Sequence, residues 1–271
     1  MQHLRRPAVA GMFYPDQPLT LSRKVKELLS AAPLSVGSGG AVPKALIVPH
    51  AGYIYSGATA ALAYARLAPA HAAIKRVVLL GPVHRVPVRG LALAGATLFS
   101  TPLGEIEIDQ ESVTALTGMP QIVVSAAAHA QEHSLEVQLP FLQSVLDDFK
   151  LLPLVVGDAT PDEVAQVLDV LWGGTETLIV VSSDLSHFLP YTRAQSVDAA
   201  TARRILQLNT TITHEQACGG TPINGLLVAA RAHQLEPQLL GLCNSGDTAG
   251  DKGRVVGYAA FAFTEKQYVT H

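Results

Sequence analysis

Cysteine is scarce in this chain, with only Cys218 and Cys243 among 271 residues. Two cysteines are too few for a disulfide framework, and they are typical of a reducing compartment. The opening segment MQHLRRPAVAGMFYP lacks the apolar stretch of a signal peptide. No apolar run approaches the ~18 residues of a membrane span. We therefore expect a soluble, cytoplasmic protein with no membrane signal.

Charge is also sparse, because charged residues make up 15% of the chain and the net charge is -3. Lysine and arginine are scattered and form no basic stripe, so the sequence carries no nucleic-acid signal. Hydrophobic residues reach 48%, a composition that predicts a large buried core rather than disorder.

Several signature motifs are missing as well. The Gly-rich segment NSGDTAGDKG (244–253) contains neither of the two glycine motifs that bind nucleotide phosphates. We interpret it as a structural loop, with Ser245 and Asp247 as candidates for positions near a site. The chain has no G-x-S-x-G elbow of a serine hydrolase and no H-E-x-x-H zinc signature.

Short, continuous apolar runs recur along the chain, each bounded by Gly, Pro, Asp or Ser. Such runs are typical of strands buried on both faces of a sheet. They lie at 44–50, 75–84, 121–125, 151–158, 177–184 and 254–263.

Stretches with helical spacing of apolar residues alternate with these runs, at 19–32, 57–68, 134–148, 160–172 and 196–208. Thr160 and Pro161 give the fourth of them a strong start signal. The alternation predicts an α/β fold with a largely parallel central sheet flanked by helices. No linker divides residues 1–271, so we expect one domain, with 36–40 (VGSGG) as a loop tip.

Histidines follow three of the apolar runs. His50 ends the first, His84 ends the second, and the run at 177–182 leads into Ser183-Asp184-Leu185-Ser186-His187. In open α/β sheets ligands bind at the carboxyl ends of strands. One such histidine would be unremarkable in a loop or core, but three at equivalent positions predict a metal site or an acid–base site.

The residues leave the third ligand of such a metal site open among Asp184, Glu132 and a cysteine thiolate. Two histidines with one anionic ligand are the pattern of non-haem iron(II) chemistry. The segment EHSLEVQLPFL (132–142) carries Glu132 and His133 at the start of a helix, where they could line a site or simply favour the helix dipole.

Cys218 precedes a glycine pair and an apolar helical stretch. A thiol at a helix N-terminus has a lowered pKa and can act as nucleophile or ligand, whereas a lone cysteine is commonly a small buried hydrophobe. His187 and Asp184 could also serve a metal-independent hydrolase as base and orienting group.

Seven segments together resemble the Memo family, whose microbial members are called AmmeMemoRadiSam system protein B. The match spans residues 5 to about 263. The segments are RRPAVAGMFYP (5–15), VPHAGYIYSG (48–57), LLGPVH (79–84), EHSLEVQLPFL (132–142), SSDLSHF (182–188), ACGGTPI (217–223) and NSGDTAGDKGRVVGYAA (244–260).

This resemblance implies a fold similar to the class III extradiol dioxygenases, which are non-haem iron(II) enzymes. It makes His50, His84 and Cys218 the metal-ligand candidates, with Asp184 and His187 beside them. Tyr53, in the PHAGY segment, joins Glu132 and His133 as a candidate for the pocket lining. A cysteine where the dioxygenases have a glutamate argues against ring cleavage, and GGTPI lacks the basic residue and histidine of animal members. His71, His129 and His214 stay structural in this interpretation.

We therefore predict a metal-dependent oxidoreductase, dioxygenase-like, with iron(II) first and copper or zinc as alternatives. His187 would be the general base, and Asp184 would orient an imidazole or bind the metal through water. The competing hypotheses are a protein that binds a peptide or small molecule in the same pocket, and the metal-independent hydrolase. The family name further implies a functional link to radical-SAM and AMMECR-type proteins.

Overall fold

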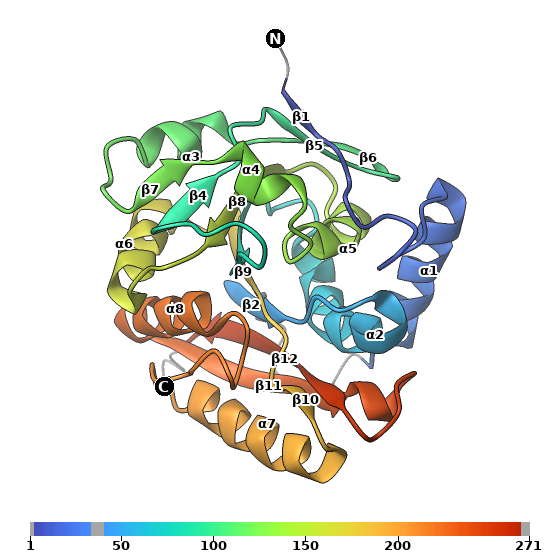
Figure 1. Ribbon diagram of the computed structural model, residues 1–271. Coiled ribbons are helices and arrows are strands. Elements are labelled where there is room, and N and C mark those ends of the chain that lie inside the picture. The colour runs from blue at the N-terminus through green and yellow to red at the C-terminus, as the bar shows by residue number, and fades with distance from the viewer. Residues whose placement is uncertain (1–2, 34–40, 267–271) are drawn as a thin grey trace, which may run out of the picture.

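The computed structural model describes residues 3–33 and 41–266 (Figure 1). The predicted loop tip at 36–40 lies outside the described residues. Among the described residues, no helix is both long enough and apolar enough to cross a membrane.

A nine-stranded sheet forms the centre of the molecule. Four neighbouring strands at its middle run parallel: β2 (Ala45–Val48), β9 (Thr177–Ser182), β3 (Arg76–Pro82) and β8 (Lys150–Val156). Nearly every side chain of these strands is buried, as their continuous apolar runs predict.

Outside this parallel centre the sheet is mixed. β12 (Val255–Glu265) pairs antiparallel with β2, and β4 (Leu91–Leu93) pairs antiparallel with β8. The remaining strands of the large sheet are β7 (Ile122–Val124), β10 (His187–Leu189) and β11 (Leu235–Asn244). A small second sheet joins β1 (Leu4–Arg5), β5 (Leu98–Thr101) and β6 (Gly104–Glu107).

The run at 121–125 forms β7, but β7 is not buried on both faces. Val123 is 39% exposed and Val124 is 69% exposed. β7 stands at the end of the strand order and pairs only with β4, so one flank and part of its surface face solvent. Apolar composition alone does not tell an edge strand from a central one.

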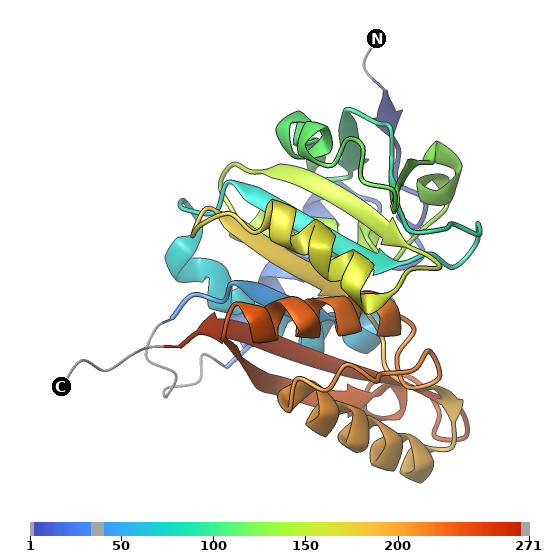
Figure 2. The same cartoon turned by 90° about the vertical axis from the view of Figure 1, so that its left-hand side faces the viewer.

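Helices cover both faces of the sheet. One face packs on α1 (Pro18–Ala31), α2 (Tyr53–Tyr64) and α5 (Leu139–Val145), and the other on α6 (Pro161–Leu171), α7 (Tyr191–Leu206) and α8 (Gly220–Ala232). Figure 2 shows α6 and α8 side by side across their face. The strand side chains alternate between the two cores: Leu46 and Val48 face the first, and Ala45 and Ile47 the second.

Shorter helices complete the chain. They are α3 (Gln110–Ala115), α4 (Ala126–Ala130) and the 3-10 turns η1 (Ala65–Ala70), η2 (Glu136–Gln138) and η3 (Ser245–Asp247).

Three predicted helices differ from the observed ones. The helix expected over 196–208 is α7, which begins five residues earlier, at Tyr191. The helix expected over 134–148 divides into the 3-10 turn η2 and α5, where Pro140 occupies the first turn of α5 and supplies no N–H to continue the preceding turn. The helix expected over 57–68 begins at Tyr53, four residues earlier, so that His50 lies just before a helix. Thr160 caps α6 in a capping box with Glu163, as predicted.

Candidate metal centre

Three neighbouring strands end at one place in the sheet. The strand order puts β9 between β2 and β3, and all three run parallel. Their carboxyl ends deliver His50, Asp184 and His84 to the same edge. The convergence expected from the apolar runs is therefore present in the fold.

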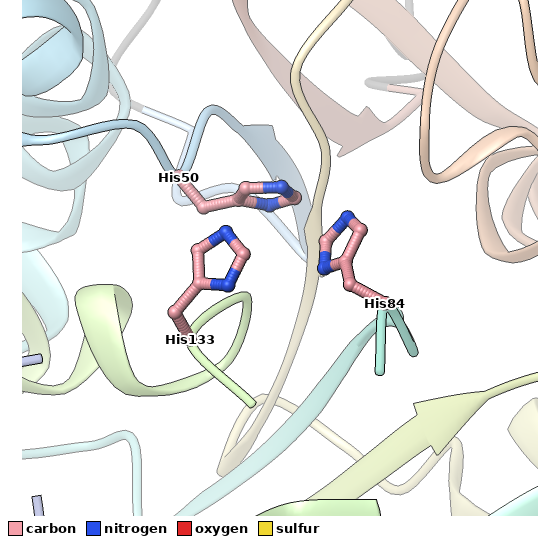
Figure 3. A group of neighbouring side chains, drawn as sticks. All are labelled: His50, His84 and His133. Atoms are coloured by element: carbon pink, nitrogen blue, oxygen red, sulfur yellow. The ribbon is translucent and has the colours of Figure 1, made fainter. Parts of the chain in front are cut away.

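Three histidines meet at this edge (Figure 3). The nitrogen atoms offered by His50, His84 and His133 all lie within 4.8 Å of one another. The ring centroid of His50 lies 5.4 Å from the ring centroid of each of the other two histidines. The ring centroids of His84 and His133 lie 4.8 Å apart. His133, which the sequence marks only as a possible pocket residue, thus joins the two predicted ligands.

The hydrogen bonds of Ser182 fix the tautomer of His50. The Ser182 hydroxyl donates its single proton to the Ser134 carbonyl over 2.6 Å and accepts from Gln138 Nε2 over 2.8 Å. Its third contact, 2.9 Å to His50 Nδ1, must therefore be accepted from an Nδ1–H. This leaves the lone pair of His50 on Nε2, where a metal can use it.

Glu132 orients His84 and lies close to His133. Its Oε1 accepts a hydrogen bond from His84 Nδ1 over 2.9 Å and lies 3.3 Å from His133 Nδ1. Backbone N–H groups of His84, His133 and Ser134 also donate to this carboxylate. A carboxylate bonded to Nδ1 leaves Nε2 of His84 as a metal ligand and raises its basicity.

The electrostatics keep Glu132 ionised and keep the imidazoles of His50 and His133 neutral. Burial raises the pKa of Glu132, but the hydrogen bonds from His84 and from the backbone outweigh it and bring that pKa down to about 2. Burial lowers the pKa of His133 to about 4, and burial together with the neighbouring histidines holds the pKa of His50 well below its ordinary value. Neutral imidazole is the form that binds metal.

Asp184 is buried and holds the backbone of the site. Its Oδ1 accepts a 2.8 Å hydrogen bond from the His50 N–H. Burial raises its pKa to about 7, against the opposing hydrogen bonds from the backbone of His50 and Ala51. The sequence predicts that Asp184 orients an imidazole or binds the metal through water. The contact present is to the backbone, where the carboxylate positions the turn between β2 and α2 that carries His50.

Cys218 lies beside His50, with its Sγ 3.4 Å from His50 Nε2. Burial, reinforced by the charge of Asp184, raises the pKa of the thiol to about 12. This is opposite to the lowered pKa that a position before a helix predicts, because desolvation of the thiolate exceeds the effect of the helix dipole. A bound metal ion would displace the thiol proton.

His187 faces a cavity of about 600 Å³ that His84 and Cys218 also line. The Leu185 carbonyl accepts a 2.8 Å hydrogen bond from His187 Nδ1, so the Nε2 lone pair is left for a proton. Burial lowers the pKa of this imidazole. A neutral histidine with a free Nε2 at a cavity wall has the form of a general base.

The remaining candidates have structural partners. Tyr53 is buried, and its hydroxyl donates to the Val137 carbonyl over 2.8 Å while its ring packs on Phe141. Ser245 accepts from the Val256 N–H, and Asp247 accepts from the Asn244 N–H, so both stabilise their own loop.

The donor set fits a transition-metal ion. Three imidazoles suit iron, copper, zinc or nickel, and a thiolate adds affinity for the softer ions. Two tetrahedral zinc ligands, one sulfur and one nitrogen, stand about 3.6 Å apart, close to the 3.4 Å between Cys218 Sγ and His50 Nε2. The orienting groups on Nδ1 are the partners that metal-binding histidines require.

Near this site, His129 has a structural role that makes the stability of the fold depend on pH. It is 2% exposed and its Nε2 bonds the Ala92 carbonyl over 2.8 Å. Burial lowers its pKa to about 4. The unfolded chain takes up a proton near pH 6.5 while the folded chain does not, so stability falls as the pH drops from about 6.5 to about 4.

Replacing His129 by glutamine, whose amide can also donate to Ala92, is expected to remove one proton from this dependence. Between pH 6.5 and pH 4 the free energy of unfolding should fall further in wild type than in the variant, by at most about 3 kcal/mol. Urea unfolding at several pH values measures it, with pH 8 as the reference at which the histidine is neutral in both states. Parallel curves for wild type and variant between pH 6.5 and pH 4 would contradict the assignment.

Known proteins match this chain over nearly its whole length. The family model described as "Memo-like protein" matches residues 5–262. A MEMO1 family protein of Archaeoglobus fulgidus is 37% identical and one of Metallosphaera sedula is 34% identical, each covering 96% of this chain and 99% of its own. A MEMO1 family protein of Aquifex aeolicus is 36% identical with the same coverage.

A solved structure shares the fold. The crystal structure of the uncharacterized protein JW3007 from Escherichia coli K12 superimposes with a TM-score of 0.53, and it covers 80% of this chain and 98% of its own. Its sequence identity of 16% supports similarity of fold alone.

Proposed function

Because the chain belongs to the Memo-like protein family, we propose that it is a metal-dependent oxidoreductase with a dioxygenase-like site. His50 and His84 would hold the ion, with His133 and Cys218 as further ligands. The observation that carries this proposal is the cluster of three histidines whose nitrogen atoms lie within 4.8 Å of one another. Hydrogen bonds hold Nδ1 of His50 and of His84, so each of these rings leaves Nε2 for an ion.

Iron(II) is the ion we propose first, with copper as the alternative. Bound iron would supply one-electron and dioxygen chemistry. The resemblance to the extradiol dioxygenases supports iron, while the Cys218 sulfur is compatible with copper.

The chain's own residues supply the rest. Glu132 fixes the orientation of His84 and lies against His133, Ser182 fixes the orientation of His50, and Asp184 holds the backbone at His50. His187 Nε2 would accept a proton from a substrate hydroxyl in the cavity. A positioned base of this kind contributes about 10²–10⁴-fold to a rate.

Metal uptake tests the proposal. Protein stripped with a chelator and reloaded anaerobically with ferrous ion is expected to retain about one equivalent per chain. Glu132→Gln is expected to weaken this binding by about 10–100-fold, because a neutral amide no longer holds the His84 imidazole in place. Equilibrium dialysis with elemental analysis gives both quantities.

Glu105→Gln is the matched control, since Glu105 is exposed on β6, and it should bind like wild type. A wild-type chain that retains neither ferrous nor cupric ion would overturn the proposal. It would favour a protein that uses the same cavity only for binding.

A further inference from the structure

The cavity beside the histidine cluster is lined partly by residues with a proposed chemical role and partly by residues without one. His84, His187 and Cys218 line its roughly 600 Å³. Leu189, Arg193 and Val197 line a wall along the start of α7. A volume of this size admits a small organic molecule.

The backbone is strained where this wall begins. Phe188 has a φ of 59°, a conformation that is unusual for a bulky side chain. The register between β10 and β12 shifts at the same place. As a result His187 and Leu189 both line the cavity, while Phe188 is 59% exposed and lies beneath the Arg254 guanidinium. Strain of this kind is characteristic of ligand sites.

Arg193 and Val197 share one face of α7, because they stand four residues apart within the helix. Leu189 precedes the helix, in β10, and lines the same cavity. The wall therefore offers a ligand two apolar side chains and one cation.

Arg193 contributes nothing evident to the stability of α7. It lies in the first turn, where a cation opposes the helix dipole, and that turn contains no acidic residue. Within 3–33 and 41–266, no carboxylate lies within ion-pair distance of its guanidinium. The buried Arg5, in contrast, is paired with Glu136. A negative charge in the cavity would complement both the guanidinium and the helix N-terminus.

A second charged side chain in the cavity lining is an anion. Glu215 lies on the loop before α8 and also lines the cavity. Hydrogen bonds, chiefly from the Thr213 side chain, lower its pKa, so it is ionised at neutral pH. A lining with one cation and one anion favours a monoanion over a doubly charged phosphate.

We propose that the cavity binds a small monocarboxylate with an apolar body, its carboxylate on Arg193 and its body against Leu189 and Val197. The far end of such a molecule would lie toward His84 and His187. Only this last assignment, which makes the bound molecule a substrate, rests on the proposed function.

Benzoate binding to the metal-free protein tests the inference. Titration followed by NMR is expected to show benzoate binding that Arg193→Gln weakens about threefold or more, because the uncharged amide cannot pair with the carboxylate and Arg193 is exposed to solvent. Benzamide, which has the same shape without the charge, and phenyl phosphate, which carries two charges, should both bind more weakly than benzoate.

Arg203→Gln, in the last turn of the same helix, is the control and should bind benzoate like wild type. Equal binding of benzoate by Arg193→Gln and wild type, equal binding of benzamide and benzoate, or no benzoate binding at all would each overturn the inference. Ferrous-ion uptake by Arg193→Gln should equal that of wild type. If the chain takes up no metal, benzoate binding should still be observed. If it does not bind benzoate, metal uptake should be unchanged.

Discussion

Replacing Arg5 by methionine is expected to lower the free energy of unfolding by about 3–5 kcal/mol, because it leaves a buried carboxylate without its cation. Arg5 is 8% exposed, and the side chain of its partner Glu136 is fully buried. The guanidinium also donates to the carbonyls of His129 and Glu132. The substitution therefore strands one charge and two acceptors at once.

The buried Glu136 carboxylate needs the Arg5 cation, and it also holds the N-terminal segment in place. Its carboxylate accepts hydrogen bonds from the N–H groups of Ala8 and Val9 and from the Tyr14 hydroxyl. The same ion pair thus fixes the loop that carries Glu132 and His133. Loss of Arg5 should loosen this loop even under conditions in which the chain still folds.

Urea unfolding monitored by circular dichroism measures the effect. Arg6→Met is the matched control, since Arg6 is the exposed neighbour of Arg5, and it should stay within about 0.5 kcal/mol of wild type. A loss below about 1 kcal/mol for Arg5→Met would contradict the view that this pair is desolvated and structurally required.

Replacing His50 by alanine is expected to abolish stable metal binding, with a loss larger than the ~10–100-fold that follows removal of an orienting partner. His50 is the point that the other donors share. It lies near His84, His133 and Cys218. Its removal leaves only one set of three donors, and Cys218 in that set does not belong to the group whose ligand atoms all lie within 4.8 Å of one another. Ferrous-ion dialysis against wild type measures the loss.

The matched control is His71→Ala, because His71 is exposed and pairs with Asp147 at the surface. It should bind one equivalent like wild type. Unchanged binding by a folded His50→Ala variant would exclude the cluster as the metal site.

A comparison of His133→Ala with Cys218→Ala identifies the third ligand. The geometry places both donors beside His50, so the variant with the larger loss reveals which of them binds the ion. If neither variant loses affinity, the ion depends on His50 and His84 alone.

The sequence by itself determined the α/β class, the family and most of the chemistry-bearing positions. Continuous apolar runs are typical of strands buried on both faces, and the carboxyl ends of neighbouring parallel strands meet at one edge of the sheet. His50, His84, Asp184 and His187 were therefore identifiable from position alone. The Memo-like resemblance drawn from the motifs is confirmed by the family model.

Tertiary structure alone decided which side chains share the site and in what state. His133 comes from a loop, not from a strand end, and it joins the cluster because Glu132 and the Arg5–Glu136 pair hold that loop. The raised pKa of Cys218 and the tautomer of His50 depend on burial and on partners distant in sequence. Periodicity records which faces of the chain are apolar, whereas desolvation and hydrogen-bond partners exist only once distant segments are packed together.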